Sequence, residues 1–251
     1  MIRQMVLKQR KLLPRVGTRK LYRLIKTDLE TGGLKCGRDK LFDIIRQNGL
    51  LIKPRRQYVK TTNSRHWMKK YPNIIRDIEL KRPDEVWVSD ITYIKTDEGY
   101  SYLTMITDAY SRKIMGFNVS SNMSAIETVK ALEMALKNRR YKLMPLIHHS
   151  DRGLQYCSQE YVTLAQRNHI KISMTENSDP YENALAERMN RTIKEEFCMS
   201  QNLKSINQVH GAVEEAVWLY NTYRPHLALN YDTPDNVYQK TPALGAAGAI
   251  S

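Results

Sequence analysis

Three acidic residues of this 251-residue chain lie in or next to predicted strands and helices, at positions where a carboxylate could serve in catalysis or metal binding. Asp90 lies in the middle of the apolar, β-favouring run 86–94, where an ionised carboxylate costs several kcal/mol unless it is paired or bound to a metal. Asp151 comes just after the short predicted strand 146–149, at the carboxyl edge of the sheet, where α/β folds place their sites. Glu187 lies in a predicted helix, and 35 residues separate it from Asp151.

Such a set of carboxylates suits Mg²⁺, which prefers oxygen ligands to cysteine or histidine. Cleaving or transesterifying a phosphodiester requires an activated oxygen nucleophile, a stabilised leaving oxygen and a neutralised phosphate. Two Mg²⁺ ions about 3.5–4 Å apart supply all three. The grouping therefore indicates metal-dependent phosphodiester chemistry. Other acids compete for these roles, since Glu182, Glu195 and Glu196 lie on the same helix as Glu187, and Asp108 lies on another predicted strand.

The predicted helix 181–199 has one polar face and one apolar face. Residues at offsets of 0, 4, 7, 8 and 11 share the polar face, which holds Asn183, Glu187, Asn190, Arg191 and Lys194. This face can present a metal ligand and, two turns later, a cation for a phosphate. An exposed lysine is more often simply solvated, so Lys194 as a DNA contact is a hypothesis to be tested.

The elements that must position these residues follow from periodicity. Alternating and apolar runs predict strands over 86–94, 100–107, 113–119, 146–149 and 170–173. Helical spacing predicts helices after Ser124, with Glu127 completing a capping box, and over 158–168, 181–199 and 205–222. This order predicts an α/β fold, a mixed sheet with helices on its faces.

The first third of the chain carries all of the excess positive charge. Residues 1–82 hold 23 basic and 6 acidic groups, whereas the whole chain has a net charge of +14. Helical spacing over 8–52, interrupted at Gly32-Gly33, predicts a small all-α, helix-turn-helix-like region. A region with this excess of positive charge is suited to binding the phosphates of DNA. The residues predicted to contact DNA, on or beside the second helix, are Lys40, Arg46, Lys53, Arg55 and Arg56. A helical subdomain that only packs remains the alternative.

Other classes of protein fit the sequence poorly. No run approaches the roughly 18 apolar residues of a spanning helix, and no apolar stretch follows the first Met as in a signal peptide. The three cysteines, Cys36, Cys157 and Cys198, are too far apart in sequence to form a C-x-x-C metal-binding motif. We expect them to be reduced and to pack in the interior. We therefore expect an intracellular protein without a membrane partner.

Four phrases, in order, resemble the transposases of the bacterial insertion-sequence-three family. They are WVSDITY at 87–93, HSDRGLQY at 149–156, DPYENALAE at 179–187, and the series Tyr220-Asn221, Arg224-Pro225-His226, Ala228-Leu229 and Thr233-Pro234. The resemblance implies an RNase H-like core of the retroviral-integrase superfamily. It also implies that Asp90, Asp151 and Glu187 are the catalytic residues and metal ligands, and that Lys194, with Arg191 and Asn183, contacts DNA.

What the resemblance implies extends to the whole chain. The expected organisation is a helix-turn-helix-like domain at 1–56, a basic linker at 57–82, a catalytic core at 83–240 and a flexible tail at 241–251. The expected reaction is cleavage at element ends followed by strand transfer, with two Mg²⁺ ions that Mn²⁺ can replace. Expected partners are element and target DNA, further copies of the chain, and an upstream-frame protein or a fusion with it. The expected location is the bacterial cytoplasm, in association with the nucleoid. The alternatives are an RNase H-fold nuclease that cuts without joining, and a catalytically dead DNA-binding regulator.

Overall fold

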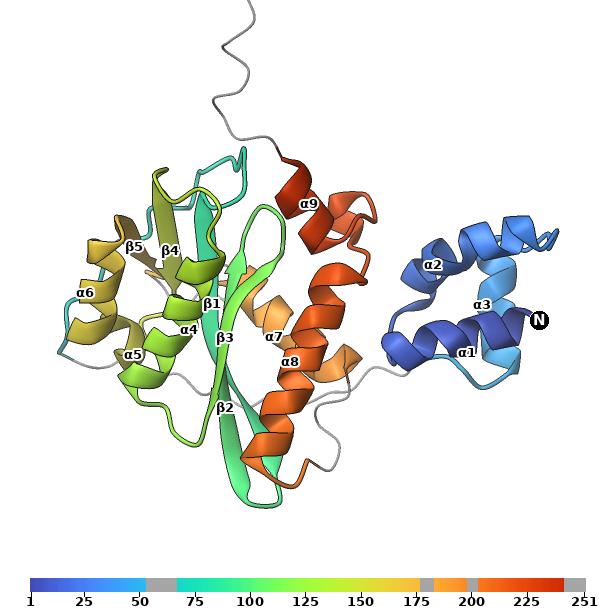
Figure 1. Cartoon of the computed structure of the whole chain (residues 1–251), viewed down its shortest axis with the longest axis horizontal. Helices are drawn as coiled ribbons and strands as arrows, with labels where there is room; N and C mark the ends of the chain where they lie inside the picture. Colours follow the sequence, from blue (N-terminus) through green and yellow to red (C-terminus); the bar gives the residue numbers. More distant parts are fainter. Residues whose placement is uncertain (53–66, 177–182, 198–202, 242–251) are drawn as a thin grey trace, which may run out of the picture.

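A five-stranded mixed sheet forms the centre of the larger part of the molecule (Figure 1). The computed structural model describes residues 1–52, 67–176, 183–197 and 203–241. The strands are β1 (Val86–Thr96), β2 (Gly99–Asp108), β3 (Ile114–Ser120), β4 (Leu146–Ser150) and β5 (Ile170–Met174). Their order is β3-β2-β1-β4-β5, with β1 to β3 antiparallel and β4 and β5 parallel to β1. The predicted mixed sheet is confirmed.

Helices cover both faces of this sheet. One face carries α4 (Ala125–Asn138), α5 (Leu154–Cys157) and α6 (Gln159–Arg167), which enclose a core around Trp87. The other carries α7 (Ala184–Glu196) and α8 (Ile206–Thr222), which pack on β1, β2 and β3. After α8 come a 3₁₀ turn, η1 (Leu227–Leu229), and a short helix, α9 (Pro234–Lys240).

The approach of α4 to β3 depends on one glycine. A Cβ at Gly116 would come within 2.3 Å of the Ala131 carbonyl oxygen and 2.6 Å of the Ala135 nitrogen. Both atoms belong to the helix backbone and cannot move aside locally, so the residue must lack a side chain for this packing to exist. Ser124 is the N-cap residue of α4 as predicted, but the capping box does not form. The carboxylate of Glu127 instead accepts from Asn118 and Lys130.

Three helices form the N-terminal part, which lies beside α8 (Figure 1). They are α1 (Ile2–Leu12), α2 (Thr18–Thr31) and α3 (Arg38–Gln47). The sequence pattern anticipated the last two around Gly32-Gly33 but not the start of α1. Their shared core includes Leu219 of α8, so this region is packed on the rest of the protein.

Residues 67–82 run along the core without helix or strand. Ile75 and Leu80 pack with Val86 and Val88 at the start of β1, so this part of the expected linker lies against the sheet. The thiols of Cys36 and Cys157 are free and buried, whereas Cys198 lies outside the described residues. Over the described ranges, no helix has the length and apolar character needed to cross a membrane.

Candidate active site

The first two predicted acids meet across neighbouring parallel strands. The register pairs Val88 of β1 with His149 of β4. Continuing it by two residues places Asp90 opposite Asp151, just beyond the end of β4, on adjacent strands about 4.8 Å apart. Because side chains alternate along a strand, both carboxylates lie on the sheet face that α7 covers.

The carboxyl group of Asp90 is held tightly and its charge is poorly solvated. Its Oδ1 accepts from the Ile91 backbone N–H at 2.9 Å, and its Oδ2 accepts from Asn190 Nδ2 at 2.8 Å. Burial, assisted by the nearby charge of Asp151, raises the pKa of Asp90 to about 7 despite these two hydrogen bonds. A carboxylate in this position is stabilised by any cation that enters the site.

Asp151 is oriented by the turn that follows β4. The backbone N–H of Gly153 donates to Asp151 Oδ1 at 3.0 Å, and Gly153 is also the N-cap residue of α5. A Cβ at Gly153 would lie 3.0 Å from the same carboxylate oxygen, so a side chain here would press on it. The Asp-Arg-Gly sequence thus fixes one acid relative to the end of its strand.

The third predicted acid, Glu187, is exposed in the first turn of α7. Its charge acts on Asp90 less strongly than that of Asp151 does. In the side-chain positions of the described residues, no three acidic, histidine or cysteine side chains gather closely enough to hold a metal ion. Asp90 and Asp151 therefore form the close pair, and Glu187 stands farther out.

Two asparagines, at the start and in the middle of the same helix, are buried against β1. Asn190 is 5% exposed and binds Asp90, while Asn183 is 6% exposed and its Nδ2 donates to the Ser89 carbonyl at 3.1 Å. The amide of Asn183 connects the start of α7 to β1, and the contact of Asn183 with DNA stays a prediction. Spacing alone had placed Asn190 on the face of Glu187 without indicating its partner.

Lys194, on α7, reaches β1 next to Asp90. Its Nζ donates to Thr92 Oγ1 at 3.2 Å and stands 4.8 Å from the centre of the Tyr93 ring. Burial lowers the pKa of Lys194, while Asp90 acts in the opposite direction. Arg191, in contrast, is exposed. The lysine therefore has a defined place two residues along the strand from Asp90.

A buried polar layer lies beneath the site, on the other face of the sheet. Ser89 Oγ donates to the Met105 carbonyl at 2.9 Å and lies 2.7 Å from Tyr156 Oη. Tyr161 Oη lies 2.9 Å from His148 Nε2, and all of these side chains are essentially unexposed. These contacts tie β1 to β2 and α5, and β4 to α6, beneath the part of the sheet that carries the two aspartates.

Two of the competing acids, Asp108 and Glu196, form hydrogen bonds or ion pairs elsewhere in the fold. Asp108 is fully buried, accepts from Ser111 and from the Asp84 backbone N–H, and has a pKa raised by burial to about 6. It therefore stabilises the turn after β2. Glu196 pairs with Arg224, and Glu182 lies outside the described residues.

Two of the five basic residues that are predicted to contact DNA from the helical region lie in the described part of the chain. Lys40 and Arg46 are exposed on α3, where Arg46 Nη1 pairs with Asp43 at 2.7 Å. The remaining predicted contacts lie outside the described residues, namely Lys53, Arg55 and Arg56.

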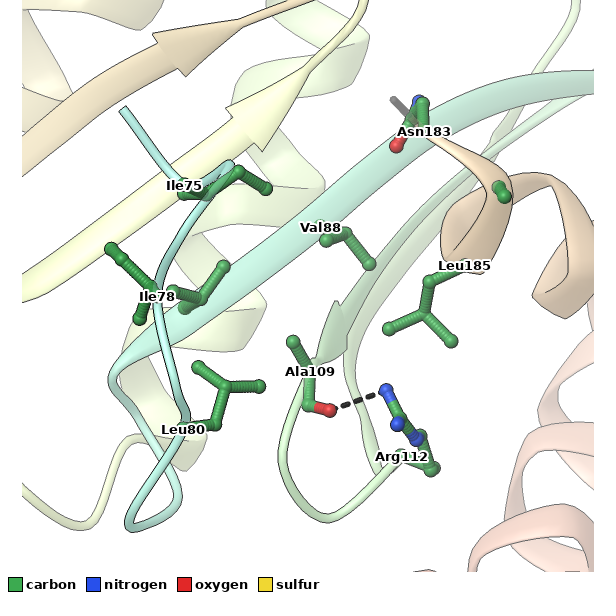
Figure 2. Close-up of a pocket in the computed structure, with 10 residues that line it drawn as sticks. Ile75, Ile78, Leu80, Val88, Ala109, Arg112, Asn183 and Leu185 are labelled. Atoms are coloured by element: carbon green, nitrogen blue, oxygen red, sulfur yellow. Dashed lines mark hydrogen bonds between the residues drawn. The ribbon is translucent and has the colours of Figure 1, made fainter. Parts of the chain in front are cut away.

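A groove of about 220 Å³ lies on the α7 side of the sheet, next to the start of β1 (Figure 2). Its walls are mostly apolar, and Ile75, Leu80 and Leu185 point into it (Figure 2). The guanidinium of Arg112 at its edge donates to the Ala109 carbonyl. None of its described lining residues is acidic, so it is not the catalytic site.

Comparisons with known proteins agree with this geometry. Two family profiles, both described as "Integrase core domain", match residues 81–180 and 168–234. Among solved structures, the HTLV-2 integrase catalytic core covers 62% of this chain and 97% of its own at 22% identity, with a TM-score of 0.50. The simian T-cell lymphotropic virus intasome covers 95% of this chain and 76% of its own at 18% identity, with a TM-score of 0.56. Together they define an RNase H-like integrase core, the fold of DDE-type transposases and integrases.

Sequence relatives narrow the class further. A Shigella sonnei protein, the insertion element IS600 uncharacterized 31 kDa protein, is 33% identical over 92% of this chain and 86% of its own length. The Shigella sonnei transposase for IS629 is 31% identical over 87% and 72%, respectively. The Escherichia coli K12 transposase InsF for IS3A is 32% identical, and this chain spans 64% of its length. The chain belongs to the IS3 family of insertion-sequence transposases.

Proposed function

We propose that this transposase uses Asp90, Asp151 and Glu187 to hold divalent metal, cleaves DNA at the ends of its element, and joins the freed 3′-hydroxyl to target DNA. The observation that carries the proposal is the placement of Asp90, in the middle of β1, opposite Asp151, just after the end of β4, with the pKa of Asp90 raised to about 7. Two such carboxylates side by side are costly without a cation.

The residues present fit Mg²⁺. The donor set consists of carboxylate oxygens, which Mg²⁺ prefers. The Oδ1 of Asn190 is buried beside Asp90 and has no hydrogen-bond partner among the described residues, so the site has an acceptor to spare for a hydrated ion. The HTLV-2 integrase core was solved in complex with magnesium. We propose two ions, replaceable by Mn²⁺, which would activate the attacking oxygen and stabilise the leaving one.

The chain's own residues then have separate tasks. Asn190 and the Ile91 N–H orient the carboxyl group of Asp90, and the Gly153 N–H orients that of Asp151. Lys194, anchored on Thr92, supplies a cation for a phosphate or base a few nucleotides inside the scissile bond. Arg191 is exposed on the same helix and supplies a second cation.

DNA recognition is assigned to the N-terminal helices. Lys40 and Arg46 lie on α3, and Lys53, Arg55 and Arg56 follow it in sequence. Several copies of the chain would assemble on DNA in the cytoplasm, as expected for a protein that must hold two element ends. An intasome is the form in which the simian virus relative was solved. An upstream-frame protein, or a fusion with it, is proposed as a further partner.

The proposal is tested with labelled element ends, Mg²⁺ and single substitutions. Asp151→Asn and Glu187→Gln should abolish nicking and joining but leave DNA binding within a few-fold, because they remove metal ligands and no phosphate contacts. Glu195→Gln, which changes the same charge on the same helix, is the matched control and should remain active. If Glu195→Gln is as damaging as Glu187→Gln, the assignment on α7 is wrong.

The alternative functions differ in their products. A nuclease of this fold would give nicked but never joined DNA, and a catalytically dead regulator would give neither. Replacing Mg²⁺ by Ca²⁺ should permit DNA binding with little cleavage, because the looser coordination of Ca²⁺ misplaces the nucleophile. Joined products that require Mg²⁺ would separate the transposase from both alternatives.

A further inference from the structure

The N-terminal helices contact the C-terminal end of α7, the helix that carries Glu187. Nζ of Lys20, on α2, lies 3.4 Å from Oε1 of Glu196, the last residue of α7. The backbone N–H of Arg15 donates to the Glu196 carbonyl at 3.1 Å. The side chains of Lys20 and Glu196 are only 21% and 22% exposed, so salt screens this pair less than a surface pair.

Glu196 is held equally firmly from the core side. Arg224, which follows α8, donates from Nε to Oε2 at 2.7 Å and from Nη2 to Oε1 at 2.5 Å. The guanidinium is 4% exposed, and its Nη1 lies 2.7 Å from His226 Nε2. Burial acts to raise the pKa of Glu196, but Arg224 and Lys20 outweigh it and lower that pKa overall. The carboxylate is therefore an ionised group shared between the two parts of the protein.

Apolar contacts surround this ion pair. Leu219 of α8, 6% exposed, belongs to the core of the N-terminal helices. Phe197, directly after Glu196, packs against that core and against the core beneath α7 and α8. The contact thus combines charge, a backbone hydrogen bond and apolar packing, which together define one orientation.

We propose that Glu196 is a positioning residue that docks the N-terminal helices on α7 and thereby sets which phosphodiester is cut. The inference rests on the proposed function, in which those helices hold the DNA and Glu187 lies at the reacting site. Glu187 and Glu196 are nine residues apart on one helix, about 13 Å along its axis. A fixed end of α7 therefore fixes the DNA-holding helices relative to the acids.

The covalent connection alone could not achieve this. Residues 53–66 join the two parts, and 14 residues can span up to about 50 Å. This upper limit does not by itself set the separation between bound DNA and the carboxylates. Docking through Glu196 selects one separation and so gives one cleavage position.

The test maps nick positions at nucleotide resolution, using the full chain, Mg²⁺ and a duplex carrying the element's own end. Lys20→Glu places a carboxylate against Glu196, so nicks should spread over neighbouring phosphodiesters while DNA affinity changes only a few-fold. Lys20→Arg should retain the parent position. Lys26→Glu is the matched control, since Lys26 lies on the same helix but pairs only at the surface, with Glu30 at 3.7 Å.

Further measurements keep the outcome decisive. Thermal unfolding checks that Lys20→Glu is folded, and Lys20→Met, which removes the charge without reversing it, replaces it if not. Inserting Gly-Ser-Gly-Ser within residues 57–66, after the proposed DNA contacts, should leave the nick position unchanged if docking sets it, and a shifted position would overturn the proposal. Unchanged precision in folded Lys20→Glu would also overturn it. A parent chain that shows no Mg²⁺-dependent nicking would refute the proposed function instead.

Discussion

Lowering the pH from 8 to 6 should weaken metal binding at the Asp90–Asp151 pair about ten-fold. Burial and the charge of Asp151 raise the pKa of Asp90 to about 7, and a metal must displace the proton held there. With that pKa, Asp90 is roughly nine-tenths ionised at pH 8 and one-tenth at pH 6, a difference of nearly ten-fold, or about 1.3 kcal/mol, in apparent affinity.

Calorimetric titration of Mg²⁺ into the full chain at pH 6, 7 and 8 measures this effect. In buffers of different ionisation enthalpy, the same titration counts the protons released, which should approach one per site at pH 6. Asn190→Leu removes a hydrogen bond that favours the ionised form of Asp90, so it should move the midpoint to higher pH. Glu195→Gln should leave it in place. A Mg²⁺ affinity that is constant from pH 6 to 8 would refute the reasoning.

The same pKa affects the stability of the metal-free protein. An acid whose pKa is higher in the folded than in the unfolded chain stabilises the fold in acid, and this contribution is lost as the pH rises through the folded value. For Asp90 the loss falls between about pH 4 and pH 7. Asp90→Asn should therefore raise the melting temperature of the metal-free protein more at pH 8 than at pH 5. Saturating Mg²⁺ should stabilise the parent and not this variant.

Three further substitutions have distinct expected outcomes. Lys194→Ala should weaken binding to the element end by about 1–3 kcal/mol if a base edge is read, and binding to unrelated duplex less; equal losses in competition titrations would make it a general phosphate contact. Lys40→Ala should reduce the slope of log affinity against log salt by about 0.9, and an unchanged slope would remove it from the DNA contacts. Gly153→Ala should press on the Asp151 carboxylate, 3.0 Å from the new Cβ, and lower Mg²⁺ affinity and nicking. Gly211→Ala, where no atom lies within 4 Å of the new Cβ, is its control, and equal effects would contradict the crowding argument.

Local patterns were sufficient to predict the sheet and the principal helices. Apolar residues recur about every 2 residues in strands and every 3.6 residues in amphipathic helices. This spacing is why β1 to β5 and the helices α4, α6, α7 and α8 could be predicted. The start of α1 was missed because no capping side chain marks it and its stability comes from burying Val6 against other helices. Thr233-Pro234 does carry a start signal for α9, since Thr233 Oγ1 accepts from the Asn236 N–H, but a helix of 7 residues is too short for periodicity.

The chemistry of the site was predictable as residue types and only partly as contacts. Asp90, within one apolar strand, and Asp151, just after another, could be chosen as site residues from the sequence, and the parallel register of the two strands places them opposite each other. The partners of Asn190 and Asn183, and the contact of Glu196 with Lys20, could not be predicted, since the two members of each pair lie 94 or more residues apart. Helical spacing indicates which residues share a face of the helix, but it does not indicate which other part of the protein that face contacts. For this reason the spacing could group Asn183 with Glu187 and Lys194 without indicating its hydrogen bond to β1.

Helix α7 connects all of these assignments, and its order along the chain has a mechanical consequence. Asn183 attaches its first turn to β1, Asn190 holds Asp90 from its middle, and Glu196 receives the N-terminal helices at its end. A rigid helix fixed at both ends cannot shift at one end without straining the other. Binding of an element end by the N-terminal helices would therefore act on Asp90 through α7. Element DNA should then alter Mg²⁺ affinity in the parent, and this coupling should be weaker in Lys20→Glu, because that substitution releases only the distant end of the helix.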